Sequence, residues 1–196
     1  CFKMTYKKKL VSIIVNCHNG EKFISRCISS ILDQSYKNFE IIFFDNYSLD
    51  KSKKIINNFK NKRIKYYYSG NKLSLYDARN KAIEKTSGEL IAFLDVDDWW
   101  DKNYLSSRKY LFNEERIDFF YSNAFIYYEK NNKLKKYKQK NLPDGKIYKF
   151  LAQDYFIIIS GLIIKKKLFK KIGNFNKKYN IIGDFDFVMR LSQNYN

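Results

Sequence analysis

Residues 10–35 read LVSIIVNCHNGEKFISRCISSILDQS, and the two halves of this stretch differ in hydrophobic period. The first half, residues 10–16, is a continuous apolar run with β-branched side chains, which is typical of a strand buried on both faces. The second half repeats apolar side chains at helical spacing: Phe23, Ile24, Cys27, Ile28, Ile31 and Leu32. The stretch therefore predicts a buried strand followed by an amphipathic helix.

The same strand-then-helix unit recurs along the first half of the chain. FEIIFFD at 39–45 precedes KSKKIINNFK at 51–60, IKYYYS at 64–69 precedes YDARNKAIEKT at 76–86, and ELIAFLD follows at 89–95. Strands that alternate with helices are joined by right-handed crossovers. We therefore expect an α/β fold in which a mostly parallel central sheet is flanked by helices on both faces.

The pattern changes after Trp100. We expect a helix over 101–115, a strand over 117–130 and a basic loop or hairpin over 131–146, which holds the only proline. A short strand and a helix ending at Gly173 follow, and a final helix begins at Gly183. We interpret residues 1–196 as one domain, with a nucleotide-binding half at about 10–100 and an α+β half at about 101–196. Since the chain begins without Met and stops soon after a helical pattern, we expect a piece of a longer protein, truncated at its C-terminus.

The composition is strongly basic, with 38 Lys and Arg against 20 Asp and Glu and a formal net charge of +18. Anionic ligands, anionic lipid surfaces and nucleic acid are all compatible with this charge, although an AT-biased genome would produce the same excess of lysine. The three cysteines, Cys1, Cys17 and Cys27, have no metal-ligand spacing and their odd number argues against a disulfide framework. No apolar run approaches the ~20 residues that cross a bilayer. We expect a cytoplasmic protein.

Polar side chains follow three predicted strands at their carboxyl ends. They are Asn16 to Asn19, Asp45 with Asn46, and Asp95 to Asp98. Open α/β sheets bind ligands at this edge, so we expect the three clusters to converge. No glycine-rich phosphate loop is present, and the crowded carboxylates after the fourth strand need a cation or hydrogen-bond donors to offset their repulsion. Hard carboxylate oxygens suit Mn²⁺ or Mg²⁺.

Several segments, in this order, resemble the landmarks of family 2 inverting glycosyltransferases with the GT-A fold. They are VSIIVNCHNGEKFISRCISSILDQSYKNFEIIFFDNYSLDKS, DARNKAI, GELIAFLDVDD, KKIGNF and GDFDFVMRL, and together they extend over nearly the whole chain. The resemblance implies a nucleotide-sugar donor, usually a UDP-sugar, bound with a divalent metal. It also implies a saccharide or lipid-linked acceptor in the synthesis of surface polysaccharide, glycolipid or glycoprotein, with the second half of the chain on the acceptor side.

The resemblance assigns roles to carboxylates in two of these landmarks. The DVD segment is similar to the family's DXD motif, so Asp97 would hold the metal that bridges to the diphosphate. Asp95 would contact the ribose or support the metal shell, and Val96 lies between the two aspartates in the donor site. Asp184 matches the second residue of the family's Glu-Asp pair, which is the general base.

The remaining matches concern the donor nucleotide. Asp45 and Asn46 match the acidic pair that reads the uracil and its ribose, with Asn46 standing where aspartate is common. Asn16 and His18 match the positions after the first strand that flank the base. Arg79 matches the arginine of the ARN landmark, near the diphosphate or the base.

Structural alternatives stay open for the same residues. Asp95 to Asp98 are also suited to capping the expected helix, and Asp184 and Asp186 to the first turn of theirs, with Asp186 pairing to Arg190. Trp99 and Trp100 suit either a sugar face or the core. Gly183 replaces the usual glutamate of the Glu-Asp pair, which changes the surroundings of Asp184 and favours weaker turnover.

A competing function is a basic module on an α/β fold that binds nucleic acid or an anionic surface. Because the basic residues are spread along the chain and no nucleic-acid motif appears, we expect no nucleic-acid partner. We instead expect the lysines to hold the chain peripherally at the inner face of the membrane.

Overall fold

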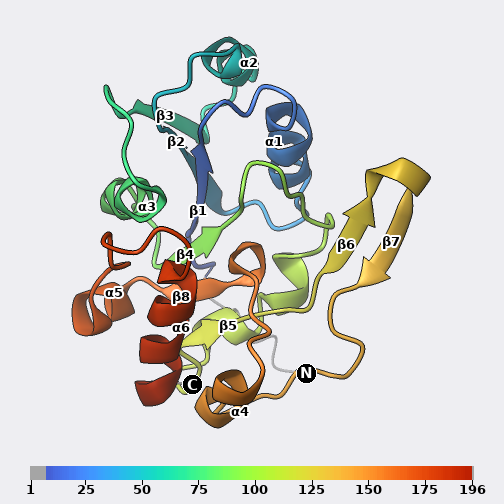
Figure 1. Cartoon of the computed structure of the whole chain (residues 1–196), viewed down its shortest axis with the longest axis vertical. Helices are drawn as coiled ribbons and strands as arrows, with labels where there is room; N and C mark the ends of the chain where they lie inside the picture. Colours follow the sequence, from blue (N-terminus) through green and yellow to red (C-terminus); the bar gives the residue numbers. More distant parts are fainter. Residues whose placement is uncertain (1–7, 196) are drawn as a thin grey trace.

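The computed structural model describes residues 8–195, which form a six-stranded sheet of order β3-β2-β1-β4-β8-β5 (Figure 1). The pairs β1–β2, β1–β4 and β2–β3 are parallel, whereas β8 runs antiparallel to both β4 and β5. This arrangement confirms the predicted α/β fold with a mainly parallel sheet. The strands are β1 (Val11–Cys17), β2 (Phe39–Asp45), β3 (Ile64–Tyr68), β4 (Leu90–Phe93), β5 (Phe119–Phe120) and β8 (Ile163–Lys165).

Helices cover both faces of this sheet and give it two hydrophobic cores. The first core packs α1 (Ile24–Leu32) and α2 (Ser52–Asn58) against Ile13 and Val15 of β1. The second packs the other helices against Ile14 of the same strand. Because neighbouring residues of a strand point to opposite faces, an unbroken apolar run is what such a doubly covered strand requires. The helices of the second face are α3 (Leu75–Glu84), α4 (Tyr148–Gln153), α5 (Lys167–Ile172) and α6 (Gly183–Asn194).

The strands and helices predicted before residue 100 are confirmed with end shifts of a few residues, as are the helix that stops at Gly173 and the final helix. Gly173 follows α5 with φ +78°, a left-handed conformation that glycine adopts without strain.

The helix predicted over 101–115 is wrong, because the segment forms only two short 3₁₀ turns, Ser106–Arg108 and Leu111–Asn113. The buried side chain of Gln34 forms hydrogen bonds with backbone groups that would bond to each other in a continuous helix. Its amide donates to the carbonyl of Asp101 at 2.6 Å and accepts from the N–H of Leu105 at 3.0 Å.

The strand predicted over 117–130 is also wrong in part, since it is split into β5 and β6 (Phe125–Tyr128). The side chain of Asn123 lies at the break and holds both backbone groups of Lys138, at 2.7 and 3.1 Å. These bonds draw the chain out of the main sheet. Helix α4 was not predicted.

The basic loop or hairpin predicted after residue 130 forms a hairpin of β6 and β7 (Lys133–Lys136), which we call the β6–β7 hairpin. It is a two-stranded sheet of its own and projects from the side of the molecule (Figure 1). Asn132, with φ 52°, makes the left-handed step at its turn.

Two of the three cysteines, Cys17 and Cys27, are buried free thiols, while Cys1 lies outside the described residues. Between residues 8 and 195, no helix combines the length and apolar character needed to cross a bilayer.

Candidate active site

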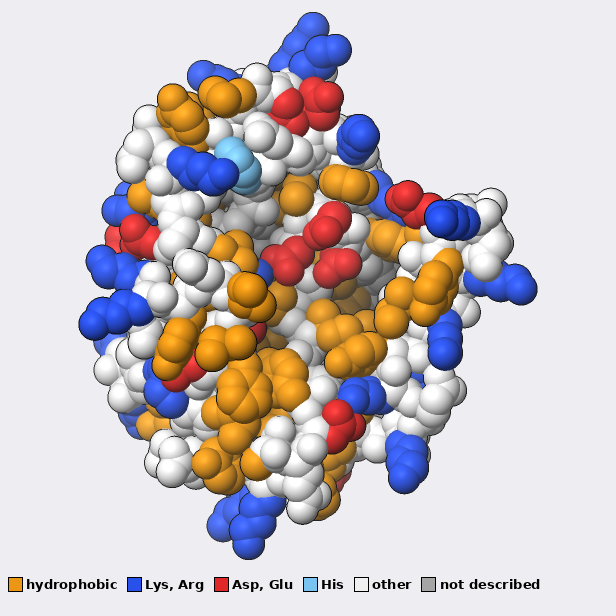
Figure 2. Space-filling view, viewed as in Figure 1, with side chains coloured by type: hydrophobic (Ala, Val, Ile, Leu, Met, Phe, Trp, Pro, Cys, Tyr) orange, Lys and Arg blue, Asp and Glu red, His pale blue; other side chains and the backbone are white. Residues whose placement is uncertain are grey.

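The carboxylates after β4 lie at the centre of the hollowed face of the molecule (Figure 2). Ser160 fixes this loop, because its hydroxyl donates to Asp98 at 2.5 Å and accepts from the N–H of Asp95 at 3.1 Å. Burial raises the pKa of Asp98 above its usual range, and the nearby charges of Asp95 and Asp97 raise it further. Three carboxylates thus lie close together at this point of the cleft.

Asp97 is the exposed member of the loop, and within residues 8–195 its carboxylate makes no hydrogen bond or ion pair. Val96 is half-buried and its methyl groups face Gly20, in the loop after β1. The alternative that these carboxylates cap a following helix is wrong, since the described chain has no α-helix there. Asp97 is therefore free to contact a ligand.

One guanidinium connects the acidic loop to α6. Arg79 of α3 is 2% exposed, and its Nη2 donates to Oδ1 of Asp95 at 2.7 Å. Its Nη1 donates to Oδ1 of Asp184, in the first turn of α6. The two carboxylates raise the pKa of Arg79, so the guanidinium stays charged despite its burial. At Asp184 burial raises the pKa of the carboxyl by more than the charge of Arg79 lowers it.

These contacts change the interpretation of Arg79. The resemblance places it near the diphosphate or the base, but both terminal nitrogens of its buried side chain are engaged by carboxylates. Its direct role in this structure is to orient Asp95 and Asp184. It thereby brings together two residues predicted for different tasks.

The ends of β1 and β2 meet beside this site. Nδ1 of His18 lies 2.9 Å from the carbonyl oxygen of Asn46, and the N–H of Asn46 donates to the carbonyl of Cys17 at 2.7 Å. The amide of Asn46 pairs with both backbone groups of Leu73, at 3.0 and 2.9 Å. Nδ2 of Asn16 is buried and has no hydrogen-bond partner in the described part of the chain. A buried donor of this kind is suited to a ligand oxygen.

Asp45 is fully buried, which differs from a residue that meets a ligand at the surface. Its carboxylate accepts from the hydroxyl of Tyr66 at 2.8 Å and from the N–H of Ser48 at 2.8 Å. Asp45 thus fixes the loop after β2. Together with Asn46 it shapes the wall on which the sequence resemblance places the base.

A cleft of about 1310 Å³ opens on the other side of the acidic loop, between residues 97–101, 158–161 and the β6–β7 hairpin. The two tryptophans divide their roles. Trp100 belongs to the core, where it stacks on Tyr104 at 4.2 Å and donates its indole N–H to the carbonyl of Ser160 at 2.7 Å. Trp99 lines the cleft, with the guanidinium of Arg26 at 3.1 Å from its ring centroid and Tyr127 at 5.5 Å.

The two acids in the first turn of α6 also differ. Asp186 forms the predicted ion pair with Arg190 at 2.8 Å, and Arg190 donates as well to the carbonyl of Asn174 at 3.0 Å. That pair ties α6 to the turn after α5. Asp184 also lies in the first turn of α6, as the structural alternative predicts, but it contacts Arg79 of α3 instead of a residue of its own helix.

Two residues that matter here were not singled out from the sequence, Ser160 and Tyr76. A Cβ added at Gly183 would lie 2.5 to 2.7 Å from ring atoms of Tyr76. The Tyr76 ring is 1% exposed and its hydroxyl donates to the carbonyl of Ile181 at 2.7 Å. Tyr76 therefore occupies the space that a side chain at position 183 would need. Local sequence patterns cannot predict such a long-range contact.

We predict that Gly183→Ala lowers the free energy of unfolding by about 1–2 kcal/mol through overpacking against Tyr76. In a Tyr76→Leu background the same change is expected to be neutral or stabilising, since alanine is the better helix former by roughly 1 kcal/mol. Urea unfolding of the four proteins of this double-mutant cycle measures the difference. An equal effect of Gly183→Ala in both backgrounds would contradict the contact.

We also predict that Arg79→Lys lowers the free energy of unfolding by about 2–3 kcal/mol, because one ammonium cannot contact both carboxylates in the geometry of the guanidinium. The matched control is Lys138→Gln, which breaks the exposed pair with Asp154 and should cost less than about 1 kcal/mol. Urea unfolding again serves as the measurement. Similar losses in the two variants would show that the buried bridge has no special weight.

Comparisons with known proteins agree with this architecture. The sequence model of "Glycosyl transferase family 2" matches residues 12–181. An uncharacterised glycosyltransferase of Methanocaldococcus jannaschii is 31% identical over 192 residues, which are 95% of this chain and 66% of the relative. The Escherichia coli protein WfaP, a UDP-Glc:α-D-GlcNAc-diphosphoundecaprenol β-1,3-glucosyltransferase, is 38% identical over 118 residues, 60% of this chain and 47% of the relative. The chain thus spans about half to two thirds of the length of these curated relatives.

Solved structures share the fold at lower identity. S. aureus TarS 1–349 has a TM-score of 0.74 and 22% identity, and the match covers 95% of this chain and 56% of that one. The mannosyltransferase PcManGT from Pyrobaculum calidifontis, solved with GDP-Man and Mn²⁺, has a TM-score of 0.70 and 15% identity, covering 97% and 54%. Because the family model matches most of the chain, residues 12–181, the chain belongs to glycosyl transferase family 2 and has the GT-A fold.

Proposed function

We propose that this chain forms the donor-binding and catalytic part of a metal-dependent inverting glycosyltransferase, which transfers a sugar from a UDP-sugar to a saccharide or lipid-linked acceptor. One observation carries the proposal: the guanidinium of Arg79 holds Asp95 of the DVD segment and Asp184 at the same site. These are the carboxylates that donor binding and proton removal need. The names of the relatives support the choice of substrates, since WfaP uses UDP-Glc and TarS is solved with UDP-GlcNAc.

The donor nucleoside is assigned to the ends of β1 and β2. Nδ2 of Asn16, which has no hydrogen-bond partner among residues 8–195, supplies a hydrogen bond, and His18 and Asn46 form the neighbouring wall. Asp45 acts there through the loop that it fixes. The methyl groups of Val96 lie beside Gly20, in the loop after β1.

The acidic loop fits a divalent cation, although residues 8–195 contain no group of three or more His, Cys, Asp or Glu arranged as a complete metal site. Mn²⁺ and Mg²⁺ commonly take one or two protein carboxylates and complete their shell with phosphate oxygens and water. The exposed carboxylate of Asp97 would hold the ion, with Asp95 and Asp98 adding negative charge around it. When bound, such an ion offsets the charge that develops on the departing nucleoside diphosphate.

Asp184 is the group assigned to the acceptor. In a single inverting displacement the acceptor hydroxyl attacks from the side opposite the leaving group and loses its proton to a carboxylate. Arg79 engages Oδ1 of Asp184, which leaves Oδ2 for the proton. Burial raises the pKa of Asp184, so its ionised form is a stronger base than an exposed aspartate.

The cleft beside Trp99 is the proposed place of the acceptor, because it opens next to the acidic loop and is lined with aromatic side chains. Relatives named for teichuronic acid and amylovoran biosynthesis support a role in surface polysaccharide synthesis. An acceptor of this kind would favour a cytoplasmic protein that lies peripherally at the inner face of the membrane. Nucleic acid has no part in this proposal.

The donor site is tested by thermal unfolding with UDP, with and without Mn²⁺. A ligand at 100 times its dissociation constant adds ~2.7 kcal/mol, so we expect a rise of several degrees in Tm for the wild type with both present. The rise should disappear in Asp97→Asn and persist in Asp101→Asn, a neighbouring carboxylate outside the DVD segment. A rise that needs no metal, or that survives in Asp97→Asn, would contradict the assigned metal ligand.

The base is tested with Asp184→Asn, which keeps a hydrogen-bonding side chain but cannot take a proton. We expect the rate of UDP release in the presence of acceptor to fall by roughly 10²–10⁴-fold, while the Tm shift with UDP and Mn²⁺ remains. In the wild type the rate should rise with pH through a value above the ordinary range of aspartate, because burial raises the pKa of Asp184 and only the ionised form accepts the proton. Asp186→Asn is the control. Equal losses in the two variants would exclude Asp184 as the base.

A further inference from the structure

The β6–β7 hairpin exposes an unusual share of large apolar side chains. Phe125 is 65% exposed, Leu134 60%, Tyr128 45% and Ile126 41%. The hairpin is bonded to no strand of the main sheet and stands out from the body of the molecule (Figure 1). Contiguous exposed apolar side chains on a projecting element mark a surface that contacts something else.

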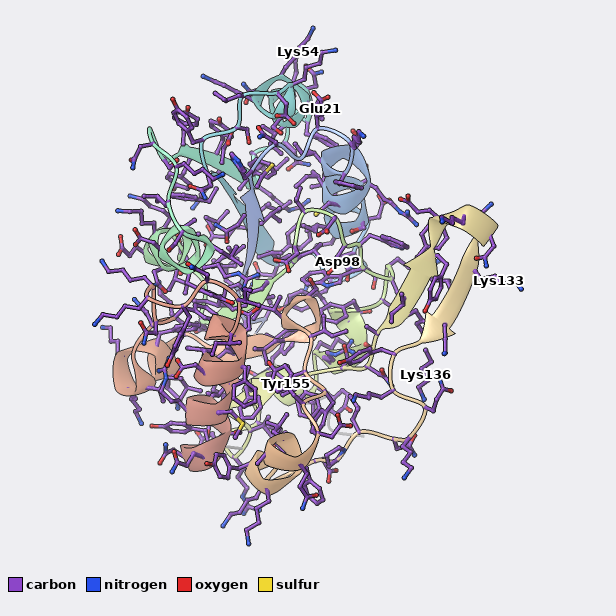
Figure 3. The ribbon with its side chains drawn as sticks, in the orientation of Figure 1. Glu21, Lys54, Asp98, Lys133, Lys136 and Tyr155 are labelled. Carbon is purple, nitrogen blue, oxygen red and sulfur yellow. The ribbon has the colours of Figure 1, made fainter. Side chains whose placement is uncertain are left out.

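The two faces of the β6–β7 hairpin carry different side chains, and one of them faces the cleft. Cross-strand partners lie on the same face, so Tyr127 and Leu134 share one face and this face turns toward the cleft, where Tyr127 contacts Trp99. The opposite face, which we call the outer face, carries the pairs Ile126–Lys135 and Tyr128–Lys133. Ile126 and Tyr128 also reach the rim of the cleft, whereas Lys133 and Lys135 lie outside it. Figure 3 shows Lys133 at the outer edge of β7.

The outer face combines cations with apolar side chains. Lys133 and Lys135 are exposed, Lys130 is exposed at the turn, and Glu129 is the only acid between residues 125 and 136. Among residues 8–195, none of these three lysines forms an ion pair. Lysines with free charge beside tyrosine and isoleucine suit the headgroup region of a bilayer, where the ammonium meets phosphate and the apolar groups meet the acyl boundary.

We propose that the outer face of the β6–β7 hairpin docks the protein on an anionic phospholipid bilayer. The inference deepens the proposed function, on which it rests for its biological setting: a lipid-linked acceptor would reach the cleft along the opposite face of the same hairpin. Charge complementarity identifies the occupant, since the chain carries +18 and the outer face has cations without partners in the described structure. The other strongly exposed apolar pair, Ile181 and Ile182, directly precedes α6 and has no lysine beside it in the sequence.

The test is co-sedimentation with vesicles of phosphatidylcholine, with and without phosphatidylglycerol. Lys133→Glu/Lys135→Glu is compared with Lys53→Glu/Lys54→Glu, which makes the same charge change on exposed lysines of α2, where Lys54 is seen at the top of Figure 3. We expect the hairpin pair to weaken binding to anionic vesicles at least about tenfold and the α2 pair to weaken it less than about threefold. Ile126→Ser/Tyr128→Ser should weaken it as well, without changing its salt dependence.

Three outcomes would overturn the proposal. Equal losses in the two charge pairs would mean that binding follows diffuse charge, and unchanged binding in both hairpin variants would place the contact elsewhere. A hairpin variant that changes the molar mass in solution but not vesicle binding would identify a second copy of the chain as the occupant. The Tm shift with UDP and Mn²⁺ is measured on every variant. It reports on the donor site separately, so failure of docking and failure of the proposed function are distinguishable.

Discussion

The bridge that the buried guanidinium of Arg79 forms to Asp95 and Asp184 is the interaction on which the candidate active site depends. A guanidinium that is 2% exposed has lost almost all contact with water, and it is stable there only while its donors meet acceptors. The bridge joins the loop after β4, helix α3 and the first turn of α6. Apolar packing alone would permit small sliding movements of α6, whereas two charge-assisted hydrogen bonds to one planar group fix its distance from β4.

This bridge also links the two halves of the proposed chemistry. Asp95 is two residues from Asp97, which is assigned to the metal, and Asp184 is the proposed base. The guanidinium of Arg79 therefore lies between the proposed donor and acceptor sides. Any charge that gathers near Asp95 adds to the electric field that Arg79 exerts at Asp184. Ser160 adds a second constraint, because its hydroxyl contacts both Asp95 and Asp98 and its carbonyl holds Trp100 in the core.

Sequence patterns predicted those parts of the chain whose structure is decided locally. The strand at 39–45 is predicted at its observed ends because most of its side chains are apolar, and the helix before Gly173 is predicted because glycine ends it. The helix predicted over 101–115 is wrong because Gln34, about 70 residues away, forms hydrogen bonds with the backbone of Asp101 and Leu105. The contact of Arg79 with Asp184 was not predicted for the same reason, because the two residues are 105 positions apart in the chain. Periodicity carries no information about such partners.

The departure at Gly183 has a consequence for Asp184 that follows from the same contacts. A glutamate at 183 would add a negative charge near Asp184 and raise its pKa further. With glycine there, Tyr76 fills the space, and the pKa of Asp184 is set by burial, which raises it, against Arg79, which lowers it. The carboxyl then ionises at a lower pH than it would beside a second acid. The missing glutamate therefore makes Asp184 a somewhat weaker candidate base but leaves it ionised over a wider range of pH.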